Sequence, residues 1–316
     1  MTDQIANEIA DRMVQVRSRF IRHQAYQQMC DRIGLVESRR RGEIKAGVNR
    51  EVEGIAIVGA SGAGKSEALK VLRNRMNAKQ RSHMSEDIGC FLSITSPSPG
   101  SLKFVATELL AAMGCPIQGN INSMKLWSLV RHHLEMHRIM FVHIDEAHDF
   151  IQNQSGREFA SVLRTIKTLT QTQSWPVSVI LSGTQDLESM IKTSREVENR
   201  FSFIRFEPLS FVSHGDGVPI LIEDLAKIGG VDVAEDLTSA DFTERLLVAA
   251  SYQFGLLIKA IADALEISLT RGSAILESRD FQKDYTQRKG AIPALNPFIT
   301  NDFRDLAPPL ISSGKE

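Results

Sequence analysis

The sequence predicts an α/β fold in which a parallel five-stranded sheet is sandwiched by helices and followed by a small helical domain. Short apolar segments rich in β-branched residues alternate with helical patterns from about residue 51 to 210. This alternation is typical of parallel sheets covered on both faces. After Pro208 the strand patterns stop, and the chain reads as helical to about Asp284. With 42% hydrophobic and 24% charged residues, the 316-residue chain can bury a substantial core.

The first 50 residues are expected to form a helical extension. Apolar residues recur there at helical spacing: Ile5, Ile9, Met13 and Val16. A second helical pattern covers residues 26–36, and the basic cluster Arg39-Arg40-Arg41 follows. The cluster is interpreted as a solvated linker, with a phosphate or DNA contact as the alternative.

The first expected strand, Gly54–Val58, leads into a glycine-rich loop that reads G-x-x-x-x-G-K-S. Glycines let the backbone turn its N–H groups around an anion at the positive end of the next helix, as in the phosphate-binding loop of nucleoside triphosphatases. We therefore expect the nucleotide to be bound by Gly59, Ala60, Ser61, Gly62, Ala63, Gly64, Lys65, Ser66 and Glu67. Lys65 would reach the β- and γ-phosphates of ATP, and the hydroxyl of Ser66 would bind Mg²⁺.

Four more strands and the helices between them follow in alternation. The strands are expected at residues 90–95, 139–144, 176–182 and 203–206. The longer helices are expected at about 101–113, 123–137 and 156–172. Ligands of such sheets bind at the carboxyl ends of the strands, so the chemistry is expected there.

The chain is expected to have four parts. These are a helical extension (1–50), an α/β nucleotide-binding domain (51–210), a helical lid (211–285) and a C-terminal tail (286–316). The tail contains four prolines and little periodicity, so we expect it to be extended or disordered and consider it a candidate docking peptide.

Two carboxylates follow the third strand. Asp145 can hold the water shell of Mg²⁺ opposite Ser66, and Glu146 can orient and deprotonate the attacking water. Phosphoryl transfer is mostly positioning and charge neutralisation, so one carboxylate for the metal and one for the water form the minimum set. The sequence therefore predicts Mg²⁺-dependent ATP hydrolysis, with Lys65 and Glu146 as catalytic residues.

Three further polar positions are expected to act on the γ-phosphate. Ser182 and Thr184 end the fourth strand, where a polar side chain can sense the phosphate or hold the water. Arg200 lies at a helix end before the last strand, a location that faces the neighbouring subunit's nucleotide in ring- or filament-forming ATPases. An arginine there can neutralise charge in the transition state, and Arg195 is the reserve candidate.

A metal site of the zinc-protease type is not expected. His133 and His137 are one helical turn apart and follow His132, but that motif needs Glu directly after its first histidine, and position 134 is Leu. The cysteines (Cys30, Cys90 and Cys115) are odd in number and lack metal-type spacing. They predict reduced thiols in the cytoplasm, in keeping with the absence of a signal peptide or an apolar run of membrane-spanning length.

With these motifs in this order, the chain resembles an AAA+ ATPase and, more narrowly, the TniB/TnsC family of transposition regulators. The AAA+ likeness is carried by the glycine loop and by the segments 143–148, 181–184 and 197–201. The narrower likeness is carried by residues 96–103 and 119–123. The resemblance covers roughly residues 15–285.

The resemblance implies a head-to-tail homo-oligomer that polymerises with ATP into rings or helical filaments around duplex DNA. Such proteins link a target-selecting protein to the transposase, and ATP hydrolysis takes the assembly apart. The residues implied to hold the DNA backbone without reading sequence are Lys103, Asn120, Ser123 and Lys125. The chain departs from the AAA+ pattern in its lid, where an arginine often follows a glycine by three residues. Ile258 stands there after Gly255, and whether Lys259 replaces the arginine stays open.

Two other functions stay open at this point. A nucleotide-gated signalling or scaffold switch that does not act on DNA is mildly favoured by the net charge of −1. A clamp-loader- or helicase-type motor is suggested by Asp145-Glu146-Ala147-His148, although helicases of that kind need a second α/β domain.

Overall fold

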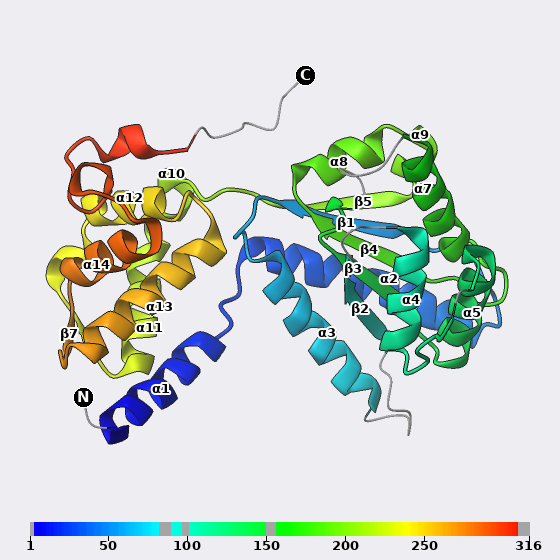
Figure 1. The fold of residues 1–316 in the computed structure, drawn as a ribbon, viewed down its shortest axis with the longest axis horizontal. Coiled ribbons are helices and arrows are strands. Elements are labelled where there is room, and N and C mark those ends of the chain that lie inside the picture. The colour runs from blue at the N-terminus through cyan, green and yellow to red at the C-terminus, as the bar shows by residue number, and fades with distance from the viewer. Residues whose placement is uncertain (1–2, 82–89, 97–100, 120, 150–155, 309–316) are drawn as a thin grey trace. The chain divides into compact units, whose positions relative to one another are not determined.

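The computed structural model describes residues 3–81, 90–96, 101–119, 121–149 and 156–308, and the chain forms two compact units (Figure 1). The α/β unit contains residues 22–60 and 65–206. The helical unit contains residues 1–21, 61–64 and 207–316. The expected helical extension is thus divided, because its first helix belongs to the helical unit and its second helix to the α/β unit.

One parallel five-stranded sheet forms the centre of the α/β unit. Its strands are β1 (Gly54–Gly59), β2 (Phe91–Thr95), β3 (Phe141–Asp145), β4 (Ser178–Gly183) and β5 (Phe201–Phe206). Their order in space is β2-β3-β4-β1-β5, and every neighbouring pair is parallel. Every residue of β1 and β4 is buried, as expected for central strands covered on both faces. The predicted five-stranded parallel sheet is confirmed.

Helices flank this sheet and fall between the strands as predicted. They are α2 (Gln24–Lys45), α3 (Lys65–Arg81), α4 (Leu102–Ala112), α5 (Ser123–Met136), α7 (Gly156–Thr170), α8 (Gln185–Lys192) and α9 (Arg195–Glu198). Side chains cap two of them, since Ser101 accepts from Phe104 N and Asn122 accepts from Lys125 N. The last strand begins at Phe201, two residues earlier than expected, because Phe201 and Ser202 already pair with β1.

The basic cluster at 39–41 is not a linker, because α2 continues through it. Arg40 is 2% exposed, and its guanidinium carbon lies 4.9 Å from the centroid of the Trp175 ring. Arg41 pairs with Glu37 one turn earlier. The middle arginine is therefore part of the core of the α/β unit.

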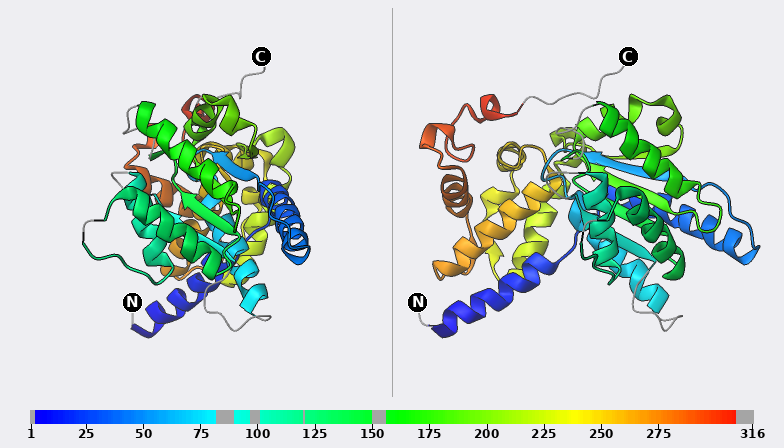
Figure 2. Two further views of the ribbon diagram at one scale, coloured as in Figure 1. Left: turned by 90° about the vertical axis from the view of Figure 1, so that its right-hand side faces the viewer. Right: turned by 45° about the vertical axis from the view of Figure 1, so that its right-hand side comes forward.

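The helical unit is a bundle with one short parallel strand pair. Its elements are α1 (Asp3–Ser18), α10 (Phe211–His214), α11 (Gly217–Gly229), β6 (Asp232–Val233), η1 (Glu235–Thr238), α12 (Ala240–Ala249), α13 (Phe254–Thr270), β7 (Ile275–Leu276), α14 (Ser278–Lys289), η2 (Pro293–Leu295) and η3 (Phe303–Leu306). Helix α1 lies along α11 and α13 (Figure 2). Its residues Met13 and Val16 enter the core of this unit, and Arg17 pairs with Asp263 and Glu266 of α13.

The segment after residue 286, expected to be extended or disordered, is packed as far as the structure describes it. Helix α14 continues to Lys289, and Phe298 and Phe303 are 7% and 1% exposed. The guanidinium of Arg245 donates to the carbonyls of Pro297 and Thr300. Periodicity missed this segment because single aromatic side chains, rather than a helical face, anchor it. Residues 309–316 of the expected tail lie outside the described residues.

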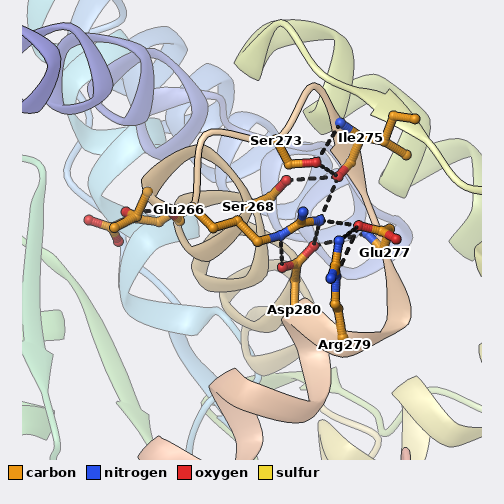
Figure 3. A network of polar contacts seen from close by, with 9 residues as sticks. Glu266, Ser268, Ser273, Ile275, Glu277, Arg279 and Asp280 are labelled. Carbon is orange, nitrogen blue, oxygen red and sulfur yellow. Dashed lines mark hydrogen bonds and ion pairs between the residues drawn. The ribbon is translucent and has the colours of Figure 1, made fainter. Parts of the chain in front are cut away.

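A network of polar contacts lies at the C-terminal end of α13 (Figure 3). Arg271 donates two hydrogen bonds to the carboxylate of Asp280, at 2.7 and 2.9 Å, and also pairs with Glu277. Asp280 is 1% exposed, and its carboxylate also accepts from the backbone N–H of Glu277 to form the capping box of α14. The network joins the end of α13 to the start of α14.

Among the described residues, no single helix meets the length and hydropathy requirements of a membrane span. The pair α12 and α13 meets them only when the two helices are taken together across a bend of 109°.

Candidate active site

The glycine loop connects β1 to α3, as its sequence predicts. β1 ends at Gly59 and α3 begins at Lys65. Gly62 and Gly64 have φ angles of +81° and +97°, a region that residues with a Cβ rarely adopt. The loop therefore needs glycine at both positions.

The side chain of Lys65 folds back over the loop. Its Nζ donates to the carbonyl oxygens of Gly59, at 2.7 Å, and Ala60, at 3.0 Å. Burial lowers the pKa of Lys65, while the carboxylates of Glu146 and Asp145 act in the opposite direction. The ammonium group of Lys65 thus lies in the electrostatic field of Glu146 and Asp145.

Asp145, the last residue of β3, faces the start of α3. Its Oδ1 accepts from Ser182 Oγ at 2.5 Å and from the backbone N–H of Glu146 at 3.1 Å, and its carboxylate also accepts from the hydroxyl of Ser66. Burial raises the pKa of Asp145, but the hydrogen bonds from Ser182 and Ser66 outweigh burial and leave it below the usual value. Asp145 is therefore an ionised acceptor beside the Ser66 hydroxyl.

Glu146 has an unusual backbone conformation. Its φ is +53°, in the left-handed region that is uncommon for residues other than glycine. The side chain is 45% exposed, and its Oε2 lies 3.3 Å from Nδ1 of His148, without the geometry of a hydrogen bond. The turn after β3 therefore leaves this carboxylate open to solvent beside the half-buried Asp145.

The two polar residues at the end of β4 have different surroundings. Ser182 is fully buried, and its hydroxyl lies between Asp145 and Nε2 of His143. Thr184 is half-buried at the start of α8, with its hydroxyl 3.4 Å from Asp186 Oδ2. Thr184 thus stays the candidate for contact with phosphate or water, whereas Ser182 contacts Asp145.

Sequence reasoning missed His143, which lies two residues before Asp145 within an apolar strand. Its Nδ1 lies 2.8 Å from Ser93 Oγ, and its Nε2 lies 2.8 Å from Ser182 Oγ. Burial lowers the pKa of His143 to about 4. The only sequence signal was a histidine in a strand whose other core positions are apolar.

Arg200 lies at the amino ends of the strands, whereas the acidic pair lies at their carboxyl ends. Its carbonyl oxygen accepts from Gly54 N, where β1 and β5 begin. Its Nε donates to Glu51 Oε1 at 2.6 Å, and its Nη1 contacts the carbonyl of Glu196. The reserve candidate Arg195 is exposed on α9. Neither arginine joins the site of its own chain.

The residues expected to hold DNA lie at the starts of α4 and α5. Trp127 Nε1 near the start of α5 donates to Leu102 O at the start of α4. Near the other ends, Cys115 Sγ, just after α4, lies 3.5 Å from His133 Nδ1 in the last turn of α5. The two helices are therefore parallel, and both positive ends face the same side. Lys103 and Lys125 are exposed and Ser123 is half-buried there, whereas Asn120 lies outside the described residues.

The donor set fits a nucleotide with Mg²⁺. Among the described residues, no group of three His, Cys, Asp or Glu side chains could hold a metal by itself. Mg²⁺ does not need such a cage, since it keeps several waters and binds through one or two carboxylates together with substrate phosphates. Asp145, Ser66 and the loop before α3 supply this kind of partial site.

The lid lysine and the histidine cluster each have partners within their own helices. Lys259 is exposed on α13 and pairs with Asp263 at 2.7 Å. The rings of His133 and His137 stack, with their centroids 5.9 Å apart.

Comparison with known proteins gives one family and one fold. A family model described as "Bacterial TniB protein" matches residues 12–210. No curated protein sequence matches the chain.

The structure resembles solved structures of Cdc6p and ORC proteins. The crystal structure of Cdc6p from Pyrobaculum aerophilum has a TM-score of 0.61 and 13% identity, covering 87% of this chain and 70% of that chain. The Aeropyrum pernix ORC1 protein in complex with DNA has a TM-score of 0.57 and 13% identity, with coverages of 84% and 64%. The Aeropyrum pernix ORC2 protein with ADPNP and ADP has a TM-score of 0.56 and 15% identity, with coverages of 80% and 67%. These likenesses, with the glycine loop and the sheet order, identify the AAA+ P-loop fold.

Proposed function

The chain belongs to the bacterial TniB family, and from this premise we propose that it is an ATP-dependent, DNA-binding regulator of transposition. The observation that carries the proposal is the meeting of Lys65, Ser66, Asp145 and Glu146 at the carboxyl edge of the sheet. A loop of backbone N–H groups, one lysine, one hydroxyl and two carboxylates is the set that a triphosphate and Mg²⁺ require.

The side chains divide the work of hydrolysis. Lys65 would exchange its bonds to the loop carbonyls for bonds to the β- and γ-phosphates, and Ser66 and Asp145 would hold the metal. Mg²⁺, when bound, neutralises charge that develops on the phosphate oxygens. Glu146, open to solvent and next to Asp145, orients the attacking water and accepts its proton. Thr184 holds the water or the γ-phosphate from the end of β4.

Completion of the site by a second subunit supports assembly. Arg200 lies at the amino ends of the strands and the acidic pair at their carboxyl ends. A head-to-tail neighbour can therefore present its Arg200 to this chain's nucleotide. Repetition of one such contact builds a ring or an open helix. Because the triphosphate bridges the contact, ATP favours the assembly and hydrolysis favours its release.

The parallel starts of α4 and α5 support binding to the DNA backbone. Two helix N-termini with the exposed Lys103 and Lys125 make a positive surface on a chain whose net charge is only −1. Contacts of this kind hold duplex DNA without reading its sequence. The assembly would wind along DNA and connect a target-selecting protein to the transposase in the cytoplasm, where the three free cysteines stay reduced.

DNA binding under controlled nucleotide and salt tests the proposal. Affinity for a duplex of arbitrary sequence should require ATP and Mg²⁺ and should fall steeply with salt. Replacement of both Lys103 and Lys125 by Ala should lower the affinity and reduce the salt slope by about 0.9 for each lost phosphate contact. Lys283→Ala, an exposed lysine on α14, is the matched control. Nucleotide-dependent assembly without any DNA binding would instead favour a signalling or scaffold switch, which the near-zero net charge also permits.

A further inference from the structure

A chain of hydrogen bonds runs across three strands and ends on Asp145. His143, on β3, is 3% exposed, and its two ring nitrogens each lie 2.8 Å from a hydroxyl, of Ser93 on β2 and of Ser182 on β4. Ser182 Oγ in turn lies 2.5 Å from Asp145 Oδ1. Ser93 and Ser182 approach the ring from opposite neighbouring strands, so both ring nitrogens have a partner.

The register of the sheet explains why these side chains meet. Ser93 and His143 are direct partners across β2 and β3, and His143 and Ile180 are direct partners across β3 and β4. Alternate residues of a strand share one face of the sheet. Asp145 lies two residues after His143 on β3, and Ser182 lies two residues after Ile180 on β4. The side chains of Ser93, His143, Asp145 and Ser182 therefore share one face of the sheet.

The positions of the protons give the chain a direction. An ionised carboxylate only accepts, so Ser182 donates its single hydroxyl proton to Asp145. Ser182 Oγ must then accept from the ring, which requires the proton of His143 on Nε2. Nδ1 of the neutral ring is left as an acceptor and takes the hydroxyl proton of Ser93. One tautomer of His143 satisfies every bond.

We propose that His143 is a positioning residue of the nucleotide site, which acts through Ser182 to fix the orientation of the Asp145 carboxylate toward Ser66 and the metal. The inference rests on the proposed ATP–Mg²⁺ function and adds to it a determinant of metal affinity. Ser182 and the backbone N–H of Glu146 both bind Oδ1 of Asp145 and so restrict rotation of the carboxylate. Outer partners of this kind typically change metal affinity or activity by about 10- to 100-fold.

Two measurements as a function of Mg²⁺ concentration test this role: equilibrium binding of a fluorescent ATP analogue and steady-state ATP hydrolysis. His143→Leu should raise the Mg²⁺ concentration for half-maximal binding and activity by about tenfold and change kcat at saturating Mg²⁺ much less. Ser182→Ala should act in the same direction. The double variant should be no worse than Ser182→Ala alone, because both substitutions break the same chain of bonds.

Two amide substitutions provide a matched pair. The side-chain amide of Gln at position 143 can reach Ser182 from the place of Nε2, whereas that of Asn reaches only the Ser93 side. His143→Gln should keep the Mg²⁺ midpoint near that of the wild type, and His143→Asn should behave like His143→Leu. Ser178→Ala is the control for general loss of a buried hydrogen bond. Ser178 lies on the same strand as Ser182 and is fully buried, but its hydroxyl donates to Glu53 O.

Each outcome decides the proposal. An unchanged Mg²⁺ midpoint in His143→Leu, or equal losses in the Gln and Asn variants, overturns the positioning role and leaves the proposed function standing. If the wild type shows neither Mg²⁺-dependent binding nor hydrolysis, both proposals fall together. Should His143→Leu fail to fold, the Gln and Asn variants decide alone, with the thermal unfolding of each as the check on folding.

Discussion

Arg200 and Asp145 lie at opposite ends of the strands of one parallel sheet. Arg200 stands where β5 begins, and Asp145 stands where β3 ends. A strand of six residues such as β1 spans about 20 Å, which no arginine side chain covers. Any catalytic role of Arg200 must therefore be exercised on the nucleotide of another subunit.

Loss of this arginine should separate nucleotide binding from hydrolysis. Arg200→Ala should bind ATP with nearly wild-type affinity and hydrolyse it on the order of 10³-fold more slowly, because the charge of the transition state is no longer neutralised in trans. Arg195→Ala, at the reserve position, distinguishes the two candidates, because only loss of the arginine that acts should slow hydrolysis. Mixing the Arg200→Ala protein with Lys65→Ala protein should restore activity, since mixed contacts contain one intact site. Additive, unrestored activities in the mixture would show that Arg200 does not act between subunits.

Removal of the carboxylate at position 146 should stop turnover without loss of binding. Glu146→Gln keeps the size of the side chain but cannot accept a proton, so kcat should fall by about 10²- to 10⁴-fold. The protein should then stay in the assembled, DNA-bound state in ATP, which a sizing column with labelled duplex would detect. Asp149→Asn, a nearby carboxylate with no assigned role, should have little effect. A Glu146→Gln protein with unchanged turnover would remove Glu146 from the mechanism.

Substitution of Lys65 should abolish nucleotide binding. The ammonium of Lys65 is buried and supplies charge-assisted hydrogen bonds, each worth about 1.5–3 kcal/mol, so two lost phosphate contacts correspond to at least about 100-fold in affinity. Binding of a fluorescent ATP analogue to Lys65→Ala measures this loss. Lys70→Ala is the matched control, because Lys70 is an exposed lysine on the same helix that pairs with Glu67. Equal affinities of the two variants would contradict the role of the loop.

The network at the end of α13 should matter for stability rather than for chemistry. Arg271→Ala leaves the buried carboxylate of Asp280 with only its capping bond from the backbone, and loss of one partner of a buried pair costs about 3–5 kcal/mol in general. Arg271 is partly exposed, so about 2–3 kcal/mol is expected here. Denaturant unfolding would measure it. Arg279→Ala, which removes only an exposed pair with Glu277, should cost less than about 1 kcal/mol.

The sequence predicted the nucleotide loop and the acidic pair because both are contiguous motifs at strand ends. Gly59 to Ser66 and Asp145-Glu146 each follow an apolar strand, and a parallel sheet brings the ends of its strands to one edge. The five strands were predicted for the same reason, since alternation of apolar strands and helices allows few other folds.

What the sequence did not reveal depends on register and on single contacts. His143 meets partners that are 50 and 39 residues away, and no local pattern shows which face of β3 it shares with them. For the same reason Ser182 was predicted, like Thr184, to contact the γ-phosphate, although its hydroxyl donates its proton to Asp145. The packing of residues 286–308 was missed because Phe298 and Phe303 anchor it singly.

Sedimentation velocity with a short duplex, Mg²⁺ and either a slowly hydrolysed ATP analogue or ADP measures the central claim most directly. With the analogue, the wild-type protein should form large complexes on the duplex, and Lys65→Ala should remain as small species under the same conditions. With ADP in place of the analogue, the complexes should dissociate. Identical sedimentation of the wild type in both nucleotides, or complexes formed equally well by Lys65→Ala, would contradict the claim that the grip on the triphosphate controls assembly.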